Sequence, residues 1–136
     1  MVPLHDADDA ATLAARLAEA LGGAADVVID PLCGVPASAA AEVLAGHGRL
    51  VNLGSSAGAT ATYSSATLRS RSAEILGYTN NDLTPDARAR ALREVLGQAA
   101  AGRLTVRHET VPLADVTAAW EGQRAGTVDG RLVLVP

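Results

Sequence analysis

The chain has 136 residues, which is long enough for one domain with a hydrophobic core. Its 11 basic residues are all arginine, and with 15 acidic residues the net charge is −4 without a basic stripe. This balance argues against nucleic acid and anionic membranes as partners. The single cysteine, Cys33, leaves no internal disulfide and cannot by itself build a zinc site.

No apolar run approaches the roughly 18 residues of a membrane-spanning helix, and the N-terminus lacks the blocks of a signal peptide. We therefore expect a soluble, cytoplasmic protein without a metal. Hydrophobic residues make up 49% of the chain, but there is no phenylalanine, one tryptophan and two tyrosines. The core must consist mainly of Ala, Val and Leu, whose burial contributes roughly 25 cal/mol per Å² of apolar surface. We expect modest stability, to which a partner chain would add.

The first predicted element is a helix over residues 10–21, where leucine recurs every four residues on one face. Asp9 is its expected N-cap, and the pair Gly22-Gly23 ends it. The same signals predict strands at 25–30, 50–53, 73–78, 104–111 and 130–135, and helices at 37–45, 65–72, 85–101 and 113–124.

The strand at 25–30 is continuously apolar in its middle rather than alternating, which indicates burial on both faces in a parallel sheet. Pro36 suits the first turn of the helix at 37–45, and Gly46 is the expected end of that helix. Alternating strands and helices predict an α/β fold, with a parallel sheet and helices on both faces.

The last third of the chain has a different pattern. Residues 104–111 alternate between apolar and polar, which is typical of an antiparallel or edge strand. The helix at 85–101 carries an apolar face that we expect to point inward. Trp120, on the helix at 113–124, is expected in the core.

The stretch Gly48–Gly58 joins an apolar strand to a loop of glycine and serine. We expect this loop to present bare backbone N–H groups at the carboxyl end of its strand, where ligands sit in open α/β sheets. Gly54 and Gly58 lack a Cβ, which would let the main chain approach a ligand closely. A plain glycine turn that closes the strand is the alternative.

Ordered motifs cover nearly the whole chain, at Asp26–Gly34, Gly48–Gly58, Ile75–Gly77, Gly102–Val106, Val111–Ala119 and Gly126–Val135. They resemble the C-terminal part of the medium-chain dehydrogenase/reductase superfamily, to which the zinc-binding dehydrogenases belong. The similarity is greatest to the quinone oxidoreductase branch, which lacks catalytic zinc. The resemblance implies an incomplete Rossmann-like parallel sheet with flanking helices, followed by a short β-α-β segment.

The resemblance also implies a domain organisation. Residues 1–103 would be a partial NAD(P)-binding domain, and residues 104–136 the segment that in the family packs onto the catalytic domain. Met1 falls near the start of the family's third Rossmann strand, so we expect a chain that lacks the catalytic domain and the first β-α-β unit. The sequence contains no G-x-G-x-x-G loop, whose amides anchor the cofactor diphosphate. NADP or NAD binding should therefore be weak or absent in the isolated chain.

By position in the family motifs, three loops would face the nicotinamide half of the cofactor. The residues so assigned are Pro31, Leu32, Cys33, Leu53, Gly54, Ser55, Ser56, Gly77, Tyr78, Thr79 and Asn80. None of the chain's residues matches a catalytic acid, base or electrophile. The implied activity is NAD(P)H-dependent reduction of a quinone or enone, with the chain inactive alone. The strand at 73–78 would pair in a homodimer, and another chain could supply the missing half.

Two other functions fit parts of the sequence. A non-catalytic, dimeric interaction or structural module would use its unpaired strand edges, which are templates for association. The run Gly54–Gly58 also fits the G-x-S-x-G elbow of serine hydrolases, with Ser56 as nucleophile followed by Asp82 or Asp86 and then His108. The residues after Gly58, however, are a poor start for the helix that such an elbow needs.

Several single residues have a structural interpretation beside a functional one. Cys33 is interpreted as a small buried hydrophobe rather than a nucleophile. Asp30 is interpreted as a polar group at a strand end, with a place in a network beside a cofactor as the alternative. Arg69 and Arg71 fit either a phosphate site or a solvated helix face. The three histidines share no metal-ligand spacing.

Overall fold

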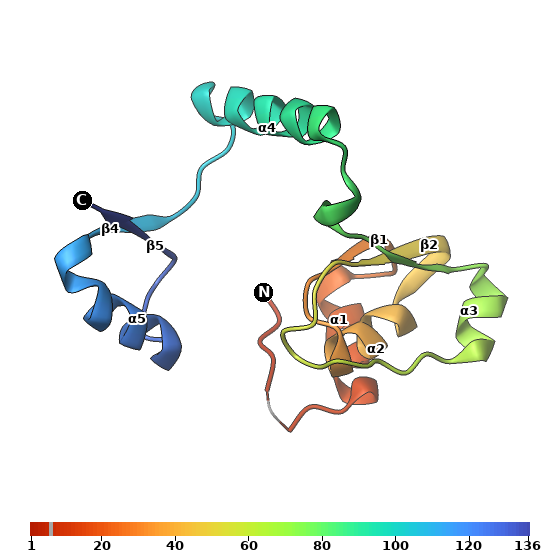
Figure 1. The fold of residues 1–136 in the computed structure, drawn as a ribbon. Coiled ribbons are helices and arrows are strands. Elements are labelled where there is room, and N and C mark those ends of the chain that lie inside the picture. The colour runs from red at the N-terminus through yellow and green to blue at the C-terminus, as the bar shows by residue number, and fades with distance from the viewer. Residues whose placement is uncertain (6) are drawn as a thin grey trace. The chain divides into compact units, whose positions relative to one another are not determined.

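The computed structural model describes residues 1–5 and 7–136 and confirms an α/β fold with parallel strands (Figure 1). The chain forms two compact units, Met1–Asp82 and Leu83–Pro136. The first unit contains α1 (Ala10–Leu21), β1 (Ala25–Asp30), α2 (Gly34–Glu42), β2 (Leu44–Asn52), α3 (Ser65–Arg71), β3 (Glu74–Gly77) and the 3-10 turn η1 (Asn80–Asp82). The second contains α4 (Pro85–Ala100), β4 (His108–Pro112), the 3-10 turn η2 (Leu113–Asp115), α5 (Val116–Ala125) and β5 (Arg131–Val135). None of the helices described is both long and apolar enough to cross a membrane.

The strands of the first unit form one parallel sheet in the order β1-β2-β3. One row across this sheet joins Val28, Leu50 and Ile75. These side chains belong to a core cluster that includes Ala37 and Ala41 of α2. The core of the unit therefore lies between the sheet and α2.

The neighbouring row of the sheet joins Ile29, Val51 and Leu76 and points to the opposite face. Ile29 is 61% exposed there. The prediction that the strand at 25–30 is buried on both faces is therefore wrong within this unit. The physical reason is that α1 packs on α2 instead of on the second face of the sheet.

The contact between α1 and α2 is built from small side chains. Leu13 and Ala14 of α1 form a buried cluster with Ala39 and Val43. The predicted bounds of α1 are confirmed, because the Asp9 side chain accepts from the Thr12 amide and Gly22 ends the helix with φ 64°. Short side chains let the two helices approach closely, and each adds little buried area.

The boundary between α2 and β2 differs from the prediction. The helix begins at Gly34, so that Pro36 lies in its first turn as expected, and it ends at Glu42. The next strand already begins at Leu44. Arg71 donates to the carbonyl oxygen of Glu42 at 2.7 Å, an acceptor that the helix end leaves open, and to that of Leu44 at 2.8 Å, where β2 begins.

The glycines that were expected to separate this helix from its strand lie inside β2. Ala25 pairs with Leu44, but Val27 pairs with Arg49, so residues 45–48 form an irregularity in the β1–β2 pairing. His47 adopts φ 61° there, a left-handed conformation that is uncommon for a non-glycine residue. Gly-His-Gly therefore marks a bulged strand rather than a helix end.

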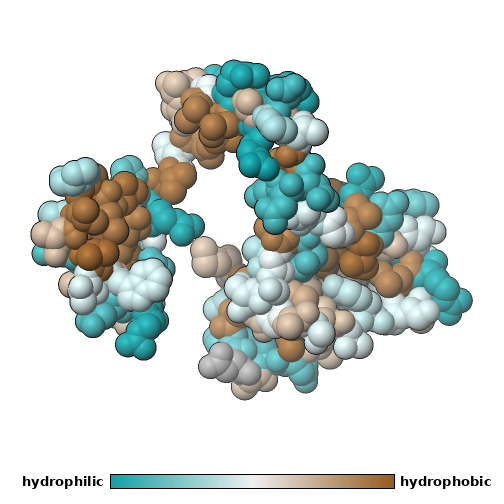
Figure 2. Space-filling view, in the orientation of Figure 1, coloured by the Kyte–Doolittle hydropathy of each residue, from teal (hydrophilic) through white to brown (hydrophobic). Residues whose placement is uncertain are grey.

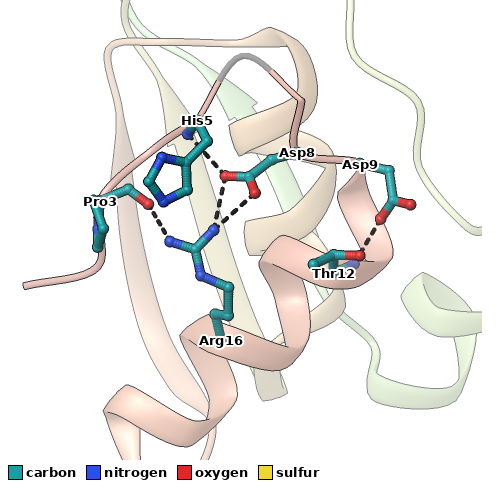
Figure 3. A network of polar contacts seen from close by, with 6 residues as sticks. All are labelled: Pro3, His5, Asp8, Asp9, Thr12 and Arg16. Carbon is teal, nitrogen blue, oxygen red and sulfur yellow. Dashed lines mark hydrogen bonds and ion pairs between the residues drawn. The ribbon is translucent and has the colours of Figure 1, made fainter.

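The N-terminal segment is tied to α1 by one arginine (Figure 3). Arg16 donates to both carboxylate oxygens of Asp8, at 2.8 and 2.9 Å, and to the carbonyl oxygen of Pro3. The backbone amide of His5 also donates to Asp8, at 2.9 Å. This amide, followed by the guanidinium, lowers the pKa of Asp8 below its ordinary 3.8. Val2 packs against the buried cluster between α1 and α2.

In the second unit, β4 and β5 pair in parallel, with His108 opposite Arg131 and Pro112 opposite Val135. An antiparallel pairing, one of the two arrangements expected, is therefore wrong, whereas the edge position is confirmed because the sheet has two strands. The strand also begins at His108 instead of residue 104.

Apolar side chains gather on the surface of the β4–α5–β5 segment (Figure 2). Trp120 was expected in the core but is 72% exposed. A two-stranded sheet and one short helix provide too few partners to enclose an indole. Leu92 and Leu96 of α4 are also exposed, although the sequence predicts that this face points inward.

Candidate functional site

The carboxyl ends of the three strands of the first unit meet at one edge of the sheet. Asp30 pairs with Asn52, and Asn52 pairs with Gly77, so the three residues form one row. The loops that follow them start side by side. We call this edge, with residues 30–33, 52–57 and 77–80, the carboxyl edge.

The first loop of the carboxyl edge is held by Asp30, which is 5% exposed. Its Oδ1 accepts from the amides of Leu32 at 3.0 Å and Cys33 at 2.9 Å. Its Oδ2 accepts from the side chain of Asn52 at 2.7 Å. These bonds hold Cys33 at φ 57°, a conformation that costs a non-glycine residue energy. Asp30 therefore shapes the turn that leads into α2.

Asn52 joins the first loop to the second. Its side-chain Nδ2 donates to Asp30 and, at 2.8 Å, to the carbonyl oxygen of Gly54. The backbone adds three bonds between the loops, from the Leu53 amide to Asp30 at 2.8 Å, from the Ser56 amide to Pro31 at 3.5 Å and from the Ala57 amide to Leu32 at 2.8 Å. The expectation of bare N–H groups is thus wrong for Leu53, Ser56 and Ala57.

The glycines of the second loop make room for the first loop. A Cβ on Gly54 would lie 2.5 Å from the carbonyl oxygen of Pro31, and one on Gly58 would lie 2.9 Å from the Cα of Gly34. Gly34 itself adopts φ 61°. The close approach expected of Gly54 and Gly58 is therefore used between the two loops of the protein.

The third loop is linked to the second through the backbone. The amide of Tyr78 donates to the carbonyl oxygen of Asn52 at 2.9 Å, continuing the sheet past Gly77. The Tyr78 hydroxyl donates to Asn80 Oδ1 at 2.9 Å, and Thr79 Oγ1 accepts from a following amide at 3.2 Å. Local bonds thus order this loop.

All the residues predicted for the cofactor lie on this one edge, namely Pro31, Leu32, Cys33, Leu53, Gly54, Ser55, Ser56, Gly77, Tyr78, Thr79 and Asn80. Sequence reasoning missed Asn52, and for Asp30 it favoured a polar group at a strand end over a place in a network beside a cofactor. The available signal was a polar residue at the carboxyl end of two successive apolar strands.

Tyr63 packs against the core cluster under the sheet. Burial raises the pKa of its hydroxyl above 10.0, and the nearby Cys33 and Asp30 act in the same direction. The hydroxyl is therefore protonated at neutral pH, as a neutral neighbour of the buried carboxylate.

The hydrolase interpretation of Ser56 lacks its structural context. The Ser56 hydroxyl donates to the carbonyl oxygen of Pro31 at 3.3 Å, and no helix begins until Ser65. A nucleophile elbow needs a helix directly after the serine. Of the two arginines considered for a phosphate, Arg71 is engaged by backbone carbonyls and Arg69 donates to Ser65 Oγ at 3.3 Å.

A parallel sheet with helices between its strands and loops gathered at its carboxyl edge defines a Rossmann-like α/β protein. The family model described as zinc-binding dehydrogenase matches residues 4–134. The chain belongs to this family, as the resemblance of its motifs predicts. A comparison with curated protein sequences gives no match.

Similar solved structures include quinone oxidoreductases and related proteins. A mycobacterial quinone oxidoreductase shares 24% identity and a TM-score of 0.79, over 98% of this chain and 42% of that one. AibC shares 25% identity and a TM-score of 0.72, over 99% of this chain and 36% of that one. A mycobacterial protein solved in complex with NADPH shares 23% identity and a TM-score of 0.73, over 98% and 42%. The chain thus spans less than half the length of these proteins.

The family is named for zinc binding, but the described residues of this chain do not fit a zinc ion. They include no group of three His, Cys, Asp or Glu side chains that could hold a metal ion. Protein zinc sites need three or four such ligands. The donor set of the described chain is therefore not that of a zinc centre.

Proposed function

We propose that this chain forms the nicotinamide side of an NAD(P)H-dependent oxidoreductase of the quinone or enone reductase type. The observation that carries the proposal is the carboxyl edge, where three loops are linked by hydrogen bonds. Membership of the zinc-binding dehydrogenase family supports it, as does the similarity to a protein solved with NADPH.

The side chains at this edge suit a flat ring that carries a carboxamide. Leu53 and Tyr78 are exposed there and offer apolar contact, and the neighbouring loops offer backbone polar groups. When bound, the nicotinamide supplies the hydride. The loops after β2 and β3 would orient the ring, and Pro31 with its neighbours would lie beside the ribose.

We also propose that the chain on its own binds the cofactor weakly and is inactive. The diphosphate of a dinucleotide is usually held by the amides of a glycine loop at a helix N-terminus. The sequence contains no G-x-G-x-x-G. Affinity would then come from the nicotinamide half alone, while a second polypeptide segment would supply the phosphate site.

The test compares NADPH with reduced nicotinamide mononucleotide, which lacks the adenine half. Backbone amide resonances are followed during titration of the full chain. We expect both compounds to shift the amides of Ser55, Tyr78 and Thr79 with similar dissociation constants in the millimolar range, which corresponds to about 4 kcal/mol. Tight binding of NADPH alone would show a phosphate site in this chain. No shift at the carboxyl edge with either compound would overturn the assignment.

A second candidate is a non-catalytic homodimer that pairs through β3. The observation that favours it is the position of β3 at the end of the sheet order, with one edge outside the three-stranded ladder. An unpaired strand edge is a template for association. Sedimentation equilibrium shows whether the chain is a dimer, and the amide titration shows whether it binds NADPH or reduced nicotinamide mononucleotide. A dimer that binds neither compound supports the module and not the reductase.

A further inference from the structure

We propose that Asp30 and Asn52 form a positioning pair that sets the spacing of the first two loops of the carboxyl edge. This inference rests on the proposed function where it concerns the cofactor. The pair would determine how well the edge fits the nicotinamide side although neither side chain need touch it.

The two oxygens of the Asp30 carboxylate have partners on different strands. Oδ1 serves its own loop through the amides of Leu32 and Cys33, whereas Oδ2 faces Asn52 on the next strand. A carboxylate that is 5% exposed needs such donors to offset its desolvation. The charge therefore makes the orientation of Asn52 energetically important.

Asn52 links the Asp30 carboxylate to the second loop. Its Nδ2 lies 2.7 Å from Asp30 Oδ2 and 2.8 Å from the carbonyl oxygen of Gly54. Two oxygens from different loops thus share one amide group. Among the side chains, only the amide of asparagine or glutamine offers two N–H donors on one uncharged nitrogen.

The first two loops of the carboxyl edge are also packed closely against each other. Gly54 leaves no space for a methyl group against Pro31, so the loops are in contact as well as hydrogen bonded. The Ala57 amide closes the far end of this contact on Leu32. Loss of the shared amide therefore changes the spacing of the loops rather than one isolated bond.

The chain contains its own reporter for this spacing. Cys33 is the single cysteine, lies in the first loop and is partly buried. Its rate of alkylation by iodoacetamide in the folded protein reports only on this loop. The main test is Asn52→Ala, which removes the two donors without adding a charge that would change thiol ionisation.

We expect Asn52→Ala to raise the alkylation rate about tenfold, the factor that corresponds to about 1.4 kcal/mol of local opening. The matched control is Asn81→Ala, in the exposed 3-10 turn η1, which should leave the rate within about twofold. Amide exchange of α1 should stay unchanged in both variants, which separates local loosening from global unfolding. An unchanged alkylation rate in folded Asn52→Ala would overturn the proposal.

Exchanging the two side chains tests whether the two residues act as a pair. In Asp30→Asn, an amide N–H replaces the oxygen that accepts from Asn52 Nδ2, so two donors face each other. Adding Asn52→Asp in the same chain restores one donor and one acceptor at this contact. We expect the single Asp30→Asn change to shift the amide resonances of Leu53 and Ala57, and the double variant to recover part of each shift. Additive shifts in the double variant would show independent roles and contradict the pairing.

The same variants distinguish failure of the pair from failure of the proposed function. If Asn52→Ala loosens the loop but the wild-type chain shows no response to reduced nicotinamide mononucleotide, the positioning pair stands and the cofactor assignment falls. If the wild type responds and Asn52→Ala responds equally, with an unchanged alkylation rate, the pair falls and the cofactor assignment stands.

Discussion

The structure leaves no space for a methyl group at residue 54. The ideal Cβ position lies 2.5 Å from the carbonyl oxygen of Pro31, a backbone atom that cannot move aside without shifting the loop. We expect Gly54→Ala to lower the free energy of unfolding by about 1–3 kcal/mol, measured by urea denaturation. Gly46→Ala is the matched control, because nothing lies within 4 Å of its Cβ position. Equal stability of the two variants would mean that the loops separate easily.

Arg71 gives a second prediction at the level of one side chain. Its Nη1 donates to two carbonyl oxygens where α2 ends and β2 begins, at 2.7 and 2.8 Å. Bonds from a charged donor contribute roughly 1.5–3 kcal/mol each. We expect Arg71→Met to destabilise the chain by at least about 1.5 kcal/mol in the same assay. Arg69→Met, on the same helix, should cost less than half as much, and the reverse order would contradict this role.

At the residue scale, the sequence pattern places the candidate residues on one edge of the sheet but does not predict the bonds that shape this edge. The candidate residues follow from the places where strands end. Predicting the role of Asn52 requires the register of β1 and β2, because the pairing of Asp30 with Asn52 brings their side chains together. The constraint on Gly54 likewise depends on which backbone passes beside it, a tertiary fact without a local signal.

Among the elements, the N-terminal segment and α1 form a pair whose contact responds to pH. The pKa of Asp8 is lowered below 3.8, first by the His5 amide and then by Arg16. A lowered carboxyl pKa stabilises the fold above about pH 3.8, and this contribution is lost as pH falls through the folded-state value. Asp8→Asn should therefore flatten the pH dependence of unfolding in that acid range.

The measurement for this segment is the midpoint of urea unfolding at neutral pH and below pH 3.8. Asp26→Asn, at an exposed position of β1, serves as the control and should keep the slope of the wild type. Arg16→Gln should resemble Asp8→Asn at neutral pH, since it removes the same ion pair and the bond to Pro3. Identical acid slopes in Asp8→Asn and wild type would contradict the assignment.

At the element scale, periodicity predicted where most helices and strands lie, and tertiary contacts decided the rest. The first helix matches because its N-cap and glycine stop are local signals. The end of α2 was misplaced because alanine favours helix, whereas Arg71 and the pairing of Ala25 with Leu44 start a strand. The predicted burial of Ile29 was wrong, because burial depends on which face of the sheet a helix covers.

At the scale of the whole molecule, the chain belongs to the zinc-binding dehydrogenase family but is much shorter than the solved proteins it resembles. The chain spans 42% of the mycobacterial quinone oxidoreductase it resembles. The two units, Met1–Asp82 and Leu83–Pro136, are each internally compact. Both leave apolar side chains exposed, such as Ile29 in the first and Trp120 in the second. Exposed apolar surface of this kind is typical of a face that packs against another segment, of the same chain or of a partner.

The alanine-rich core of the first unit has a calorimetric consequence. The largest fully buried side chains are three leucines, Leu13, Leu44 and Leu50, and most of the remaining core residues are alanine. Unfolding should therefore hydrate little apolar surface, and its heat-capacity increment should fall below the usual range of about 12–15 cal/mol/K per residue. Differential scanning calorimetry measures this increment, and a value above about 15 would reveal burial by self-association.

A small increment flattens the curve of unfolding free energy against temperature. Such a chain is marginally stable over a wide range of temperature instead of being strongly stable at one optimum. Cooling would gain little folded protein, and warming would lose it gradually. The fraction of folded chain would then depend mainly on the concentration of whatever binds the folded state, by mass action.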